Sequence, residues 1–430
     1  MSVFVSYISP LLYMVLLAFV LTRIKWLQKT GFTKKLVVSF FVAKCLAGFA
    51  YNFIALHYIP NRGDIWPFFD DGLYLYHSFL QSPSAFFDTW SKGFHYNDLN
   101  ALNTDSGLIR SAFEVIKTFH FLLDFLSFGS LPGNTVIFNF LASLCFFYCW
   151  KFFKEQFASH GIVAGLIFFL LPSMFFYSAG ILKEGFVISL LCLLVPLTHQ
   201  LVTRNFSVKI ILGWVLALAS LCILKFFVAG IWLFCTVVWC ALAVFSIKQW
   251  LVVLGAVALA CACFFYSVRL FPAIDLPGYL VQRQAEFLSL PAASAVPVAV
   301  LTPDPQGFLK ALPMALNNVL FKPLPGEGGK LMYLLFSAEM ILYWFGLAWL
   351  FIRRKKADSI LPQQRSLATV LLLFAMLNLL VIGLIVPNIG ALLRYRSIFF
   401  PFLAFFATIT TGWEPSGANW YRRLSKWVAA

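Results

Sequence analysis

Residues 63–76 read GDIWPFFDDGLYLY and set three carboxylates, those of Asp64, Asp70 and Asp71, among aromatic side chains. An apolar run long enough to cross a bilayer ends directly before this stretch. A carboxylate held at a membrane surface loses hydration, so a cluster of three indicates a functional site. The stretch therefore predicts a membrane protein whose chemistry takes place at the edge of the bilayer.

The composition of the chain also indicates a membrane protein. Of the 430 residues, 61% are hydrophobic and only 11% are charged, whereas about a quarter of the residues of a soluble protein are charged. All nine cysteines fall within apolar runs, which favours packing over disulfides or a zinc site. We expect a single membrane domain that comprises residues 1–430.

The apolar runs predict an all-α polytopic integral membrane protein with about 11 transmembrane helices, because each run has roughly the length that crosses a bilayer. The shorter runs are those that begin near residues 161, 210 and 397. All the runs begin near Tyr7, Leu36, Thr135, Gly161, Ile181, Ile210, Phe226, Leu251, Leu331, Leu367 and Ser397.

The basic residues predict the orientation, because cytoplasmic loops of membrane proteins carry an excess of Lys and Arg. With the N-terminus outside, the inner loops hold 18 basic and three acidic residues, a surplus equal to the net charge of +15. The outer segments then hold 13 of each. We therefore expect a multi-pass protein of the inner (cytoplasmic) membrane with its C-terminus in the cytoplasm. The charge serves orientation and contact with anionic membrane lipids, and no nucleic-acid partner is needed to explain it.

Two long outer loops are expected, at residues 57–134 and 272–330. The first contains SGLIRSAFEVIKTFHFLLDFLSF (106–128), whose apolar residues recur at helical spacing between charged ones. We interpret this segment as an amphipathic helix that lies in the membrane interface. The second loop is rich in Pro and Gly and includes QGFLKALPMALNNVLFKPLPGE (306–327), where we also expect an interfacial amphipathic helix.

The three aspartates are candidate catalytic residues. A carboxylate here can act as general base on a sugar hydroxyl, and partial burial would raise its pKa toward a useful range. Tyr74 and His77, about one turn further on, are candidate substrate-binding residues. Alternatively, the aspartates cap a helix that begins near Leu73. A divalent metal held by Asp70, Asp71 and a histidine is a further alternative, and no cofactor is indicated.

Two other segments on the expected outer side carry candidate substrate-binding residues. Lys183 and Glu184 lie in a tight turn between two apolar runs, where the lysine can contact a phosphate; alternatively, it reaches lipid headgroups and the glutamate caps the next helix. Arg394, Tyr395 and Arg396 precede the last apolar run. Positive charge on this side opposes the orientation rule, and the two guanidinium groups can chelate a phosphate or pyrophosphate.

Lys44 and Glu339 lie inside apolar runs. Ionisable groups within a membrane are costly unless they find a partner. We expect the two side chains to pair with each other across the bundle, in preference to acting as a proton relay.

The arrangement resembles the GT-C-type glycosyltransferases, polytopic membrane enzymes that take sugars from polyprenyl-phosphate donors at the outer or lumenal face. Their D-[DE]-x-x-Y pattern matches Asp70, Asp71 and Tyr74, and RYRSIFFPF (394–402) is similar to their late R-x-R with a following proline. LPSMFFYSAGILKEG (171–185) and FKPLPGE (321–327) are similar to segments of bacterial cell-surface polysaccharide synthesis proteins. One additional span precedes the span that leads into the carboxylate loop, which is a departure from many members.

The resemblance implies an inverting glycosyltransferase with a polyprenyl-phosphate-linked sugar donor and a cell-envelope glycan or lipid acceptor. The donor phosphate would lie near Arg394, Arg396 and Lys183, and Asp70 or Asp71 would be the base. Two alternatives stay open. One is a polysaccharide polymerase or ligase that uses a lipid-pyrophosphate-linked glycan. The other is a lipid-linked-sugar flippase or another transporter, for which polar residues should be spread through the spans.

Overall fold

The computed structural model describes residues 8–59, 64–84, 86–87, 107–204, 206–245, 247–290, 294–327, 331–352, 361–411, 426 and 428. Within these ranges the chain is all-helical, without strands, and one isolated antiparallel bridge joins Ala295 to Asn388. The helices are α1 (Ser9–Arg23), α2 (Lys25–Gln28), α3 (Lys34–Tyr58), α4 (Ile65–Gln81), α6 (Gly107–Ser127), α7 (Leu131–Leu170), α8 (Pro172–Tyr177), α9 (Lys183–Val202), α10 (Val208–Leu224), α11 (Phe226–Val244), α12 (Gln249–Phe265), α13 (Ser267–Leu270), α14 (Leu276–Ser289), α15 (Pro305–Phe321), α16 (Leu331–Ile352), α17 (Pro362–Ile385), α18 (Ile389–Arg396) and α19 (Phe400–Thr410).

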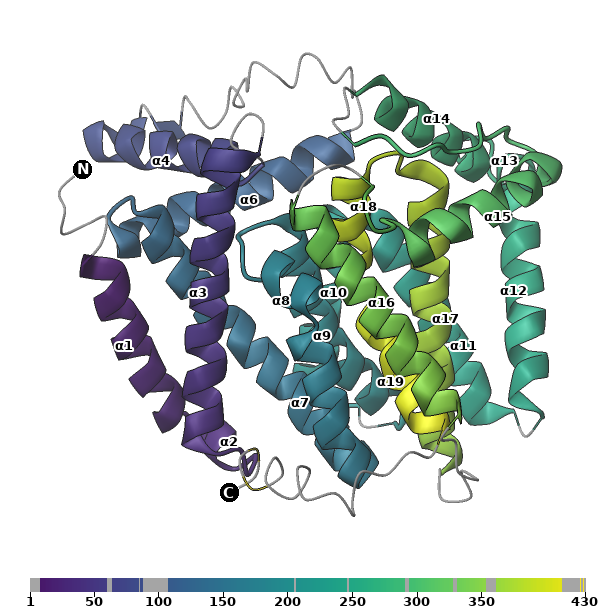
Figure 1. Cartoon of the computed structure of the whole chain (residues 1–430), viewed down its shortest axis with the longest axis horizontal. Helices are drawn as coiled ribbons and strands as arrows, with labels where there is room; N and C mark the ends of the chain where they lie inside the picture. Colours follow the sequence, from purple (N-terminus) through teal and green to yellow (C-terminus); the bar gives the residue numbers. More distant parts are fainter. Residues whose placement is uncertain are drawn as a thin grey trace.

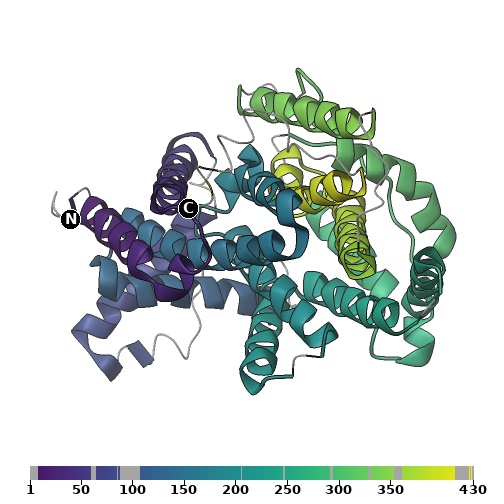
Figure 2. The ribbon, with the colours of Figure 1, turned by 90° about the horizontal axis from the view of Figure 1, so that it is seen from below.

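Most of the long helices run between two ends of a bundle (Figure 1). Helices α4, α6, α14 and α15 lie across one end, which we call the upper end, and the opposite end is the lower end. Figure 2 shows the early helices, in purple and blue, on one side of the bundle and the late helices, in green and yellow, on the other. Residues from the two halves of the sequence therefore meet in the middle of the molecule.

In the described part of the chain, six helices are long and apolar enough to cross a membrane: α3, residues 131–157 of α7, α9, α11, α16 and α17. A seventh span is possible if α18 and α19, which are bent by 47° relative to each other, count as one. The predicted number of about 11 is not confirmed. Helices α1, α10 and α12 coincide with predicted spans but have only 15, 17 and 17 residues, which is short for a hydrocarbon core of about 30 Å.

The apolar run predicted to begin at Gly161 lies within α7, and α7 folds back on itself before it ends. A Cβ atom added to Gly165 would lie 1.8 Å from Nε1 of Trp150, fifteen residues earlier in the sequence. A straight helix would separate such residues by about 22 Å. The second arm of α7 therefore returns along the first and leads directly into the short helix α8.

Helix α8 binds the two ionisable side chains that were expected to pair with each other. Both carboxylate oxygens of Glu339 accept from the backbone N–H of Ser173, at 3.1 and 3.2 Å, at the N-terminal end of α8. Nζ of Lys44 donates to Phe175 O and to Ser178 Oγ, at 3.3 and 2.5 Å, at the C-terminal end. The expected Lys44–Glu339 pair is thus wrong. Each charge instead complements one end of the helix dipole.

Close packing of α3 against α7 fixes the turn that leads into α9. A Cβ atom on Gly48 would lie 2.5 Å from Cγ2 of Thr135, so only glycine permits this approach of the two helices. Beside this contact, Asn52 donates to Thr135 Oγ1 at 2.9 Å, and Asn139 donates to Ala179 O at 2.8 Å. These buried hydrogen bonds hold residues 178–182 in place and thereby position the start of α9.

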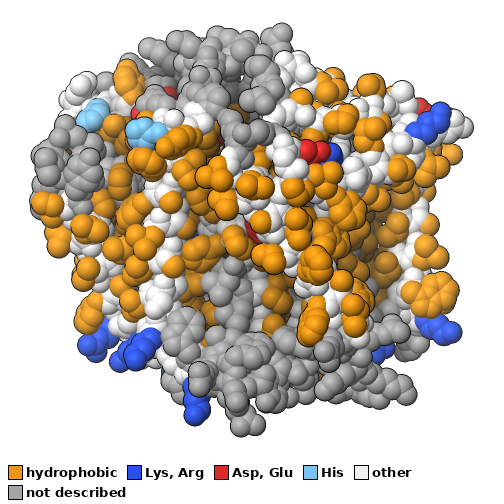
Figure 3. Space-filling view, in the orientation of Figure 1, with side chains coloured by type: hydrophobic (Ala, Val, Ile, Leu, Met, Phe, Trp, Pro, Cys, Tyr) orange, Lys and Arg blue, Asp and Glu red, His pale blue; other side chains and the backbone are white. Residues whose placement is uncertain are grey.

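Charged side chains are distributed unequally between the two ends. Basic side chains follow the lower edge of the bundle, whereas acidic, histidine and further basic side chains occur toward the upper end (Figure 3). The lower end also holds Val428, whose carbonyl accepts from Thr33 N at 3.1 Å. The apolar surface between the two ends is the one expected to face lipid tails.

Candidate functional site

An ion pair between Asp64 and Arg394 joins the two halves of the sequence at the upper end. Nη1 of Arg394 lies 2.6 Å from Oδ2 of Asp64. Asp64 occupies the N-cap position of α4, but its side chain makes no capping hydrogen bond. Its side chain is 53% exposed, whereas that of Arg394 is 20% exposed. A carboxylate open to solvent therefore sits beside a largely buried guanidinium group.

Glu184, in the first turn of α9, lies between two cations. Its Oε1 atom is 3.2 Å from Nζ of Lys225 and 3.8 Å from Nε of Arg394. The side chain of Glu184 is only 3% exposed. A buried carboxylate is stable only when positive charge compensates it, and Lys225 and Arg394 supply that charge.

Tyr395 packs against the same two cations. Nζ of Lys225 lies 3.9 Å from the centroid of the Tyr395 ring, and Cζ of Arg394 lies 5.2 Å from it. Nη2 of Arg394 also donates to the Tyr395 hydroxyl at 3.4 Å. The aromatic face restricts where the lysine and arginine side chains can point.

Lys183 reaches the site from the first residue of α9. Its Nζ atom lies 3.7 Å from the ring centroid of Phe113 on α6, and it interacts electrostatically with Glu184, Lys225, Asp64 and Arg394. We call these five charged residues, Asp64, Lys183, Glu184, Lys225 and Arg394, the charged cluster. Three cations and two carboxylates leave a surplus of one positive charge, so the charged cluster favours an anionic ligand.

One donor in the charged cluster has no hydrogen-bond partner among the residues described. Nε of Arg394 is buried, and Oε1 of Glu184, at 3.8 Å, is too far away for a hydrogen bond. A buried N–H that lacks an acceptor is costly. An oxygen of a bound anion would remove this cost, which makes Arg394 the centre of the candidate site.

The other two aspartates lie further along α4. Asp71 is about two turns, or roughly 10 Å, from Asp64, and it interacts electrostatically with Lys117 and Glu114 of α6. Burial raises the pKa of the Asp71 carboxyl to about 6, while Lys117 offsets part of the increase. Asp70 is half-buried beside it. The structure therefore separates Asp64 from Asp70 and Asp71.

The alternative that these aspartates cap a helix near Leu73 is wrong, because α4 begins eight residues earlier, at Ile65. Tyr74 is 55% exposed on α4. His77 is exposed too, and its ring centroid lies 5.5 Å from that of Tyr76. Tyr74 and His77 follow Asp64 by 10 and 13 residues, which is roughly 15 and 20 Å along α4.

Arg396 does not share the surroundings of Arg394. Its guanidinium group is buried and donates to the carbonyl oxygens of Val319, at 3.1 Å, and Lys322 at the end of α15. Residues two apart on a helix point to nearly opposite sides. The two arginines on α18 therefore do not form the expected chelating pair.

Sequence reasoning missed Lys225 and Tyr51 as members of the site. Lys225 stands between two apolar runs on the predicted outer side, so it opposes the orientation rule in the same way as Arg394. That signal could have identified it. Tyr51 lies buried on α3 and interacts electrostatically with Arg394. An apolar run that contains several aromatics gives no such signal.

A buried polar network lies beneath α4, near the join of α6 and α7. Asn134 donates to Asp124 Oδ1 at 2.7 Å and lies 3.3 Å from Nδ1 of His120. Burial raises the pKa of Asp124 to about 7, although hydrogen bonds from Asn134 and Ser127 oppose this increase. Burial also lowers the pKa of His120 to about 3, so its imidazole is neutral at physiological pH.

A metal site is not apparent. Among the described residues, no group of three or more His, Cys, Asp or Glu side chains is arranged to hold a metal ion. The alternative of a metal bound by Asp70, Asp71 and a histidine thus has no support from the part of the chain that the structure describes. The geometry instead brings Arg394 and Lys225 together around Glu184, with the exposed carboxylate of Asp64 beside Arg394.

Comparison of the chain with protein-family models, with curated proteins and with solved structures finds no match. Over the residues that the structure describes, the chain is a helical protein with six or seven helices able to span a membrane.

Proposed function

We propose that the protein is an inverting membrane glycosyltransferase of the GT-C type. It transfers a sugar from a polyprenyl-phosphate donor to a cell-envelope glycan or lipid acceptor. The observation that supports this proposal is the pairing of Asp64 with Arg394, at 2.6 Å, across 330 residues of sequence. It places an exposed carboxylate next to a cluster with surplus positive charge, which is what transfer from a lipid phosphate requires.

The cations of the charged cluster bind the donor phosphate in this proposal. Arg394 offers its unpartnered Nε–H to a phosphate oxygen, and Lys225 and Lys183 add positive charge nearby. The phosphate gains negative charge as it leaves the sugar, so these cations stabilise the transition state more than the ground state. Arg394 would then give up part of its contact with Asp64 and contact the phosphate instead.

Asp64 is the general base. The acceptor hydroxyl gives its proton to the carboxylate, and its oxygen forms a bond to the anomeric carbon. The bond from that carbon to the phosphate oxygen breaks, and polyprenyl phosphate leaves with the electron pair. Binding of phosphate to Arg394 releases the Asp64 carboxylate from part of its ion pair, so that it can accept the proton of the acceptor hydroxyl. Asp71, with its pKa raised to about 6, is the alternative base on the same helix.

The proposed orientation places the upper end outside the cytoplasm. The basic lower edge of the bundle (Figure 3) then faces the cytoplasm, in accordance with the excess of Lys and Arg in cytoplasmic loops. The site would thus open at the outer, periplasmic face of the inner membrane, where the donor and acceptor lipids meet.

A lipid-linked-sugar flippase is the second candidate, and α8 favours it. Transporters often contain interrupted helices whose ends face an ion or substrate near the middle of the membrane. In this chain, however, Glu339 and Lys44 already occupy the two ends of α8. A transported group would have to displace them, and for this reason we prefer the transferase.

The test of the proposed function is the Asp64→Asn variant. Loss of a general base should lower turnover by roughly 10²- to 10⁴-fold. Thermal stability should fall much less than turnover, because Asp64 caps no helix, its side chain is 53% exposed, and asparagine keeps an oxygen that can accept from Arg394. Asp275→Asn is the matched control, since Asp275 is also at the upper end but caps α14 through Gly278 N, at 2.8 Å.

Turnover of each variant is measured in membranes from cells that lack the natural protein. The lipids that accumulate in those cells are also identified. Accumulation of a polyprenyl-phosphate-linked monosaccharide supports the transferase, whereas an accumulated lipid-linked repeat unit indicates the polymerase or ligase. If only Asp71→Asn is inactive, the base is Asp71. Full turnover in the Asn variants of Asp64, Asp70 and Asp71 would end the glycosyltransferase proposal.

A further inference from the structure

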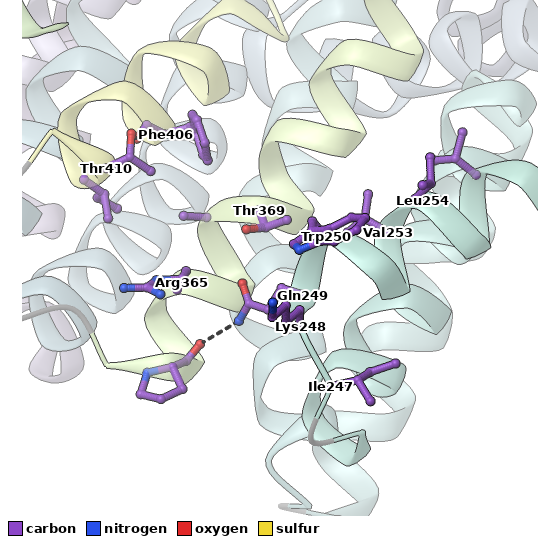
Figure 4. A pocket seen from close by; sticks show the side chains of 14 residues that line it. Ile247, Lys248, Gln249, Trp250, Val253, Leu254, Arg365, Thr369, Phe406 and Thr410 are labelled. Carbon is purple, nitrogen blue, oxygen red and sulfur yellow. Dashed lines mark hydrogen bonds between the residues drawn. The ribbon is translucent and has the colours of Figure 1, made fainter.

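The lower end of the bundle has a cleft that the proposed function does not use. It has a volume of about 1100 Å³ and lies between α12, α17 and α19 (Figure 4). Helices α12 and α17 begin there, and α19 ends there. Sites for small molecules have volumes of about 300–1,000 Å³, so this cleft has room for a large ligand.

The walls of the cleft are mainly apolar. Val253 and Leu254 of α12 form one wall, and Phe406 and Ile409 of α19 form another. Val252 is the only residue of the 17 in α12 that is buried, and Leu254 is 60% exposed. Because α12 is thus exposed along most of its length within an apolar protein surface, the cleft is accessible to the hydrocarbon chains of the bilayer.

The charged residues of the cleft are both basic. Of the 14 described residues that line it, only Lys248 and Arg365 carry a charge, and both side chains are exposed. They stand on different walls, at the starts of α12 and α17. Gln249 joins these two helix starts by donating to Ser366 Oγ at 2.9 Å and to Pro362 O at 3.4 Å. The hydrogen bonds hold the two basic residues on neighbouring elements at the membrane surface.

We propose that this cleft binds one anionic phospholipid of the bilayer. Its acyl chains lie along the apolar faces of α12 and α19, and its phosphate lies between Lys248 and Arg365. Charge complementarity carries the proposal, because basic pockets between transmembrane helices attract anionic headgroups and a zwitterionic lipid brings no net charge. The site is at the opposite end of the bundle from the charged cluster, so it does not depend on the proposed function.

The test compares phosphatidylglycerol with phosphatidylcholine of the same acyl chains, added to the purified, delipidated full-length protein. Lipid binding is measured by native mass spectrometry and by the shift of the melting temperature. We expect the natural protein to prefer phosphatidylglycerol. The double variant Lys248→Gln/Arg365→Gln should lose roughly 30-fold in apparent affinity for it, because each basic residue near a membrane surface contributes about 1 kcal/mol.

The matched control is Arg23→Gln/Lys209→Gln, which removes the same charge outside the cleft. It should keep the preference for phosphatidylglycerol. Thr369→Trp, which fills the cleft, should reduce binding of both lipids to this site while both charges remain. An unchanged preference in the Lys248→Gln/Arg365→Gln protein would overturn the proposal. Displacement of phosphatidylglycerol by an equal concentration of polyprenyl phosphate would overturn it too, since the occupant would then be a donor lipid.

Discussion

Arg394 and Arg396 belong to the same short helix, yet their guanidinium groups have different kinds of partner. Arg394 contacts the side chains of Asp64 and Glu184, and its Nε–H lacks an acceptor among the described residues. Arg396 donates to two backbone carbonyls at the end of α15. The first geometry suits a ligand and the second suits a structural role.

Alanine variants of the two arginines should therefore fail in different ways. Arg394→Ala removes a charge-assisted contact worth about 1.5–3 kcal/mol, so kcat/KM should fall roughly 10- to 100-fold while the protein stays folded. Arg396→Ala leaves buried carbonyls without a donor and should lower stability by about 1–3 kcal/mol. The measurements are donor kinetics and thermal melting of both purified variants.

Arg394→Lys serves as the control, because an ammonium group keeps the charge but loses the planar fork. It should recover only part of the lost kcat/KM. If Arg396→Ala is stable and inactive while Arg394→Ala is fully active, the assignment of Arg394 as the phosphate ligand is incorrect.

At the scale of a single element, α8 is held by a charge at each end. Glu339 binds the N-terminal end through Ser173, and Lys44 binds the C-terminal end through Phe175 and Ser178. The sequence showed two opposite charges inside apolar runs, and these predicted a direct pair. Their actual partners are backbone groups of a six-residue helix. A helix of only six residues within an apolar run is too short to be recognised from hydropathy.

A double-mutant cycle distinguishes these two arrangements. Glu339→Gln and Lys44→Met should each destabilise the protein, since each removes a charge that complements a helix end. The coupling energy between them should stay below about 0.5 kcal/mol, because the two side chains do not touch. Thermal or denaturant unfolding in detergent gives the change in the free energy of unfolding for the two single variants and for the double variant. A coupling of several kcal/mol would mean that the charges form a direct ion pair.

At the scale of the whole molecule, the sequence predicted the helical class and the six longest spans. It also identified Asp64 and Arg394 as candidate site residues. The separate apolar runs that begin near Thr135 and Gly161 also predicted that the chain reverses direction between them, in agreement with the closeness of Gly165 to Trp150. The sequence could not place Lys225 beside Glu184, 41 residues away. Contacts of that kind depend on how helices pack, and packing is specified by side-chain shape at many positions together.

The proposed topology is tested by labelling single cysteines on a background in which the nine natural cysteines are replaced. Pro303→Cys lies at the upper end, just before α15, and Lys209→Cys lies at the lower end, at the start of α10. A membrane-impermeant thiol reagent added to intact spheroplasts should modify the first and not the second. Permeabilised cells are the control, in which both should react. Labelling of Lys209→Cys alone would place the charged cluster in the cytoplasm.

The separation of Asp64 and Arg394 along the chain has a consequence for biosynthesis. Their contact spans 330 residues, and ribosomes add about 5–20 residues per second. Asp64 is therefore exposed for roughly 15 to 70 seconds before Arg394 has been synthesised. Throughout that interval the nascent protein has a carboxylate at the membrane surface and lacks its arginine. The pair can form only after nearly the whole chain has been synthesised, so a chain truncated after α17 would contain Asp64 but lack Arg394.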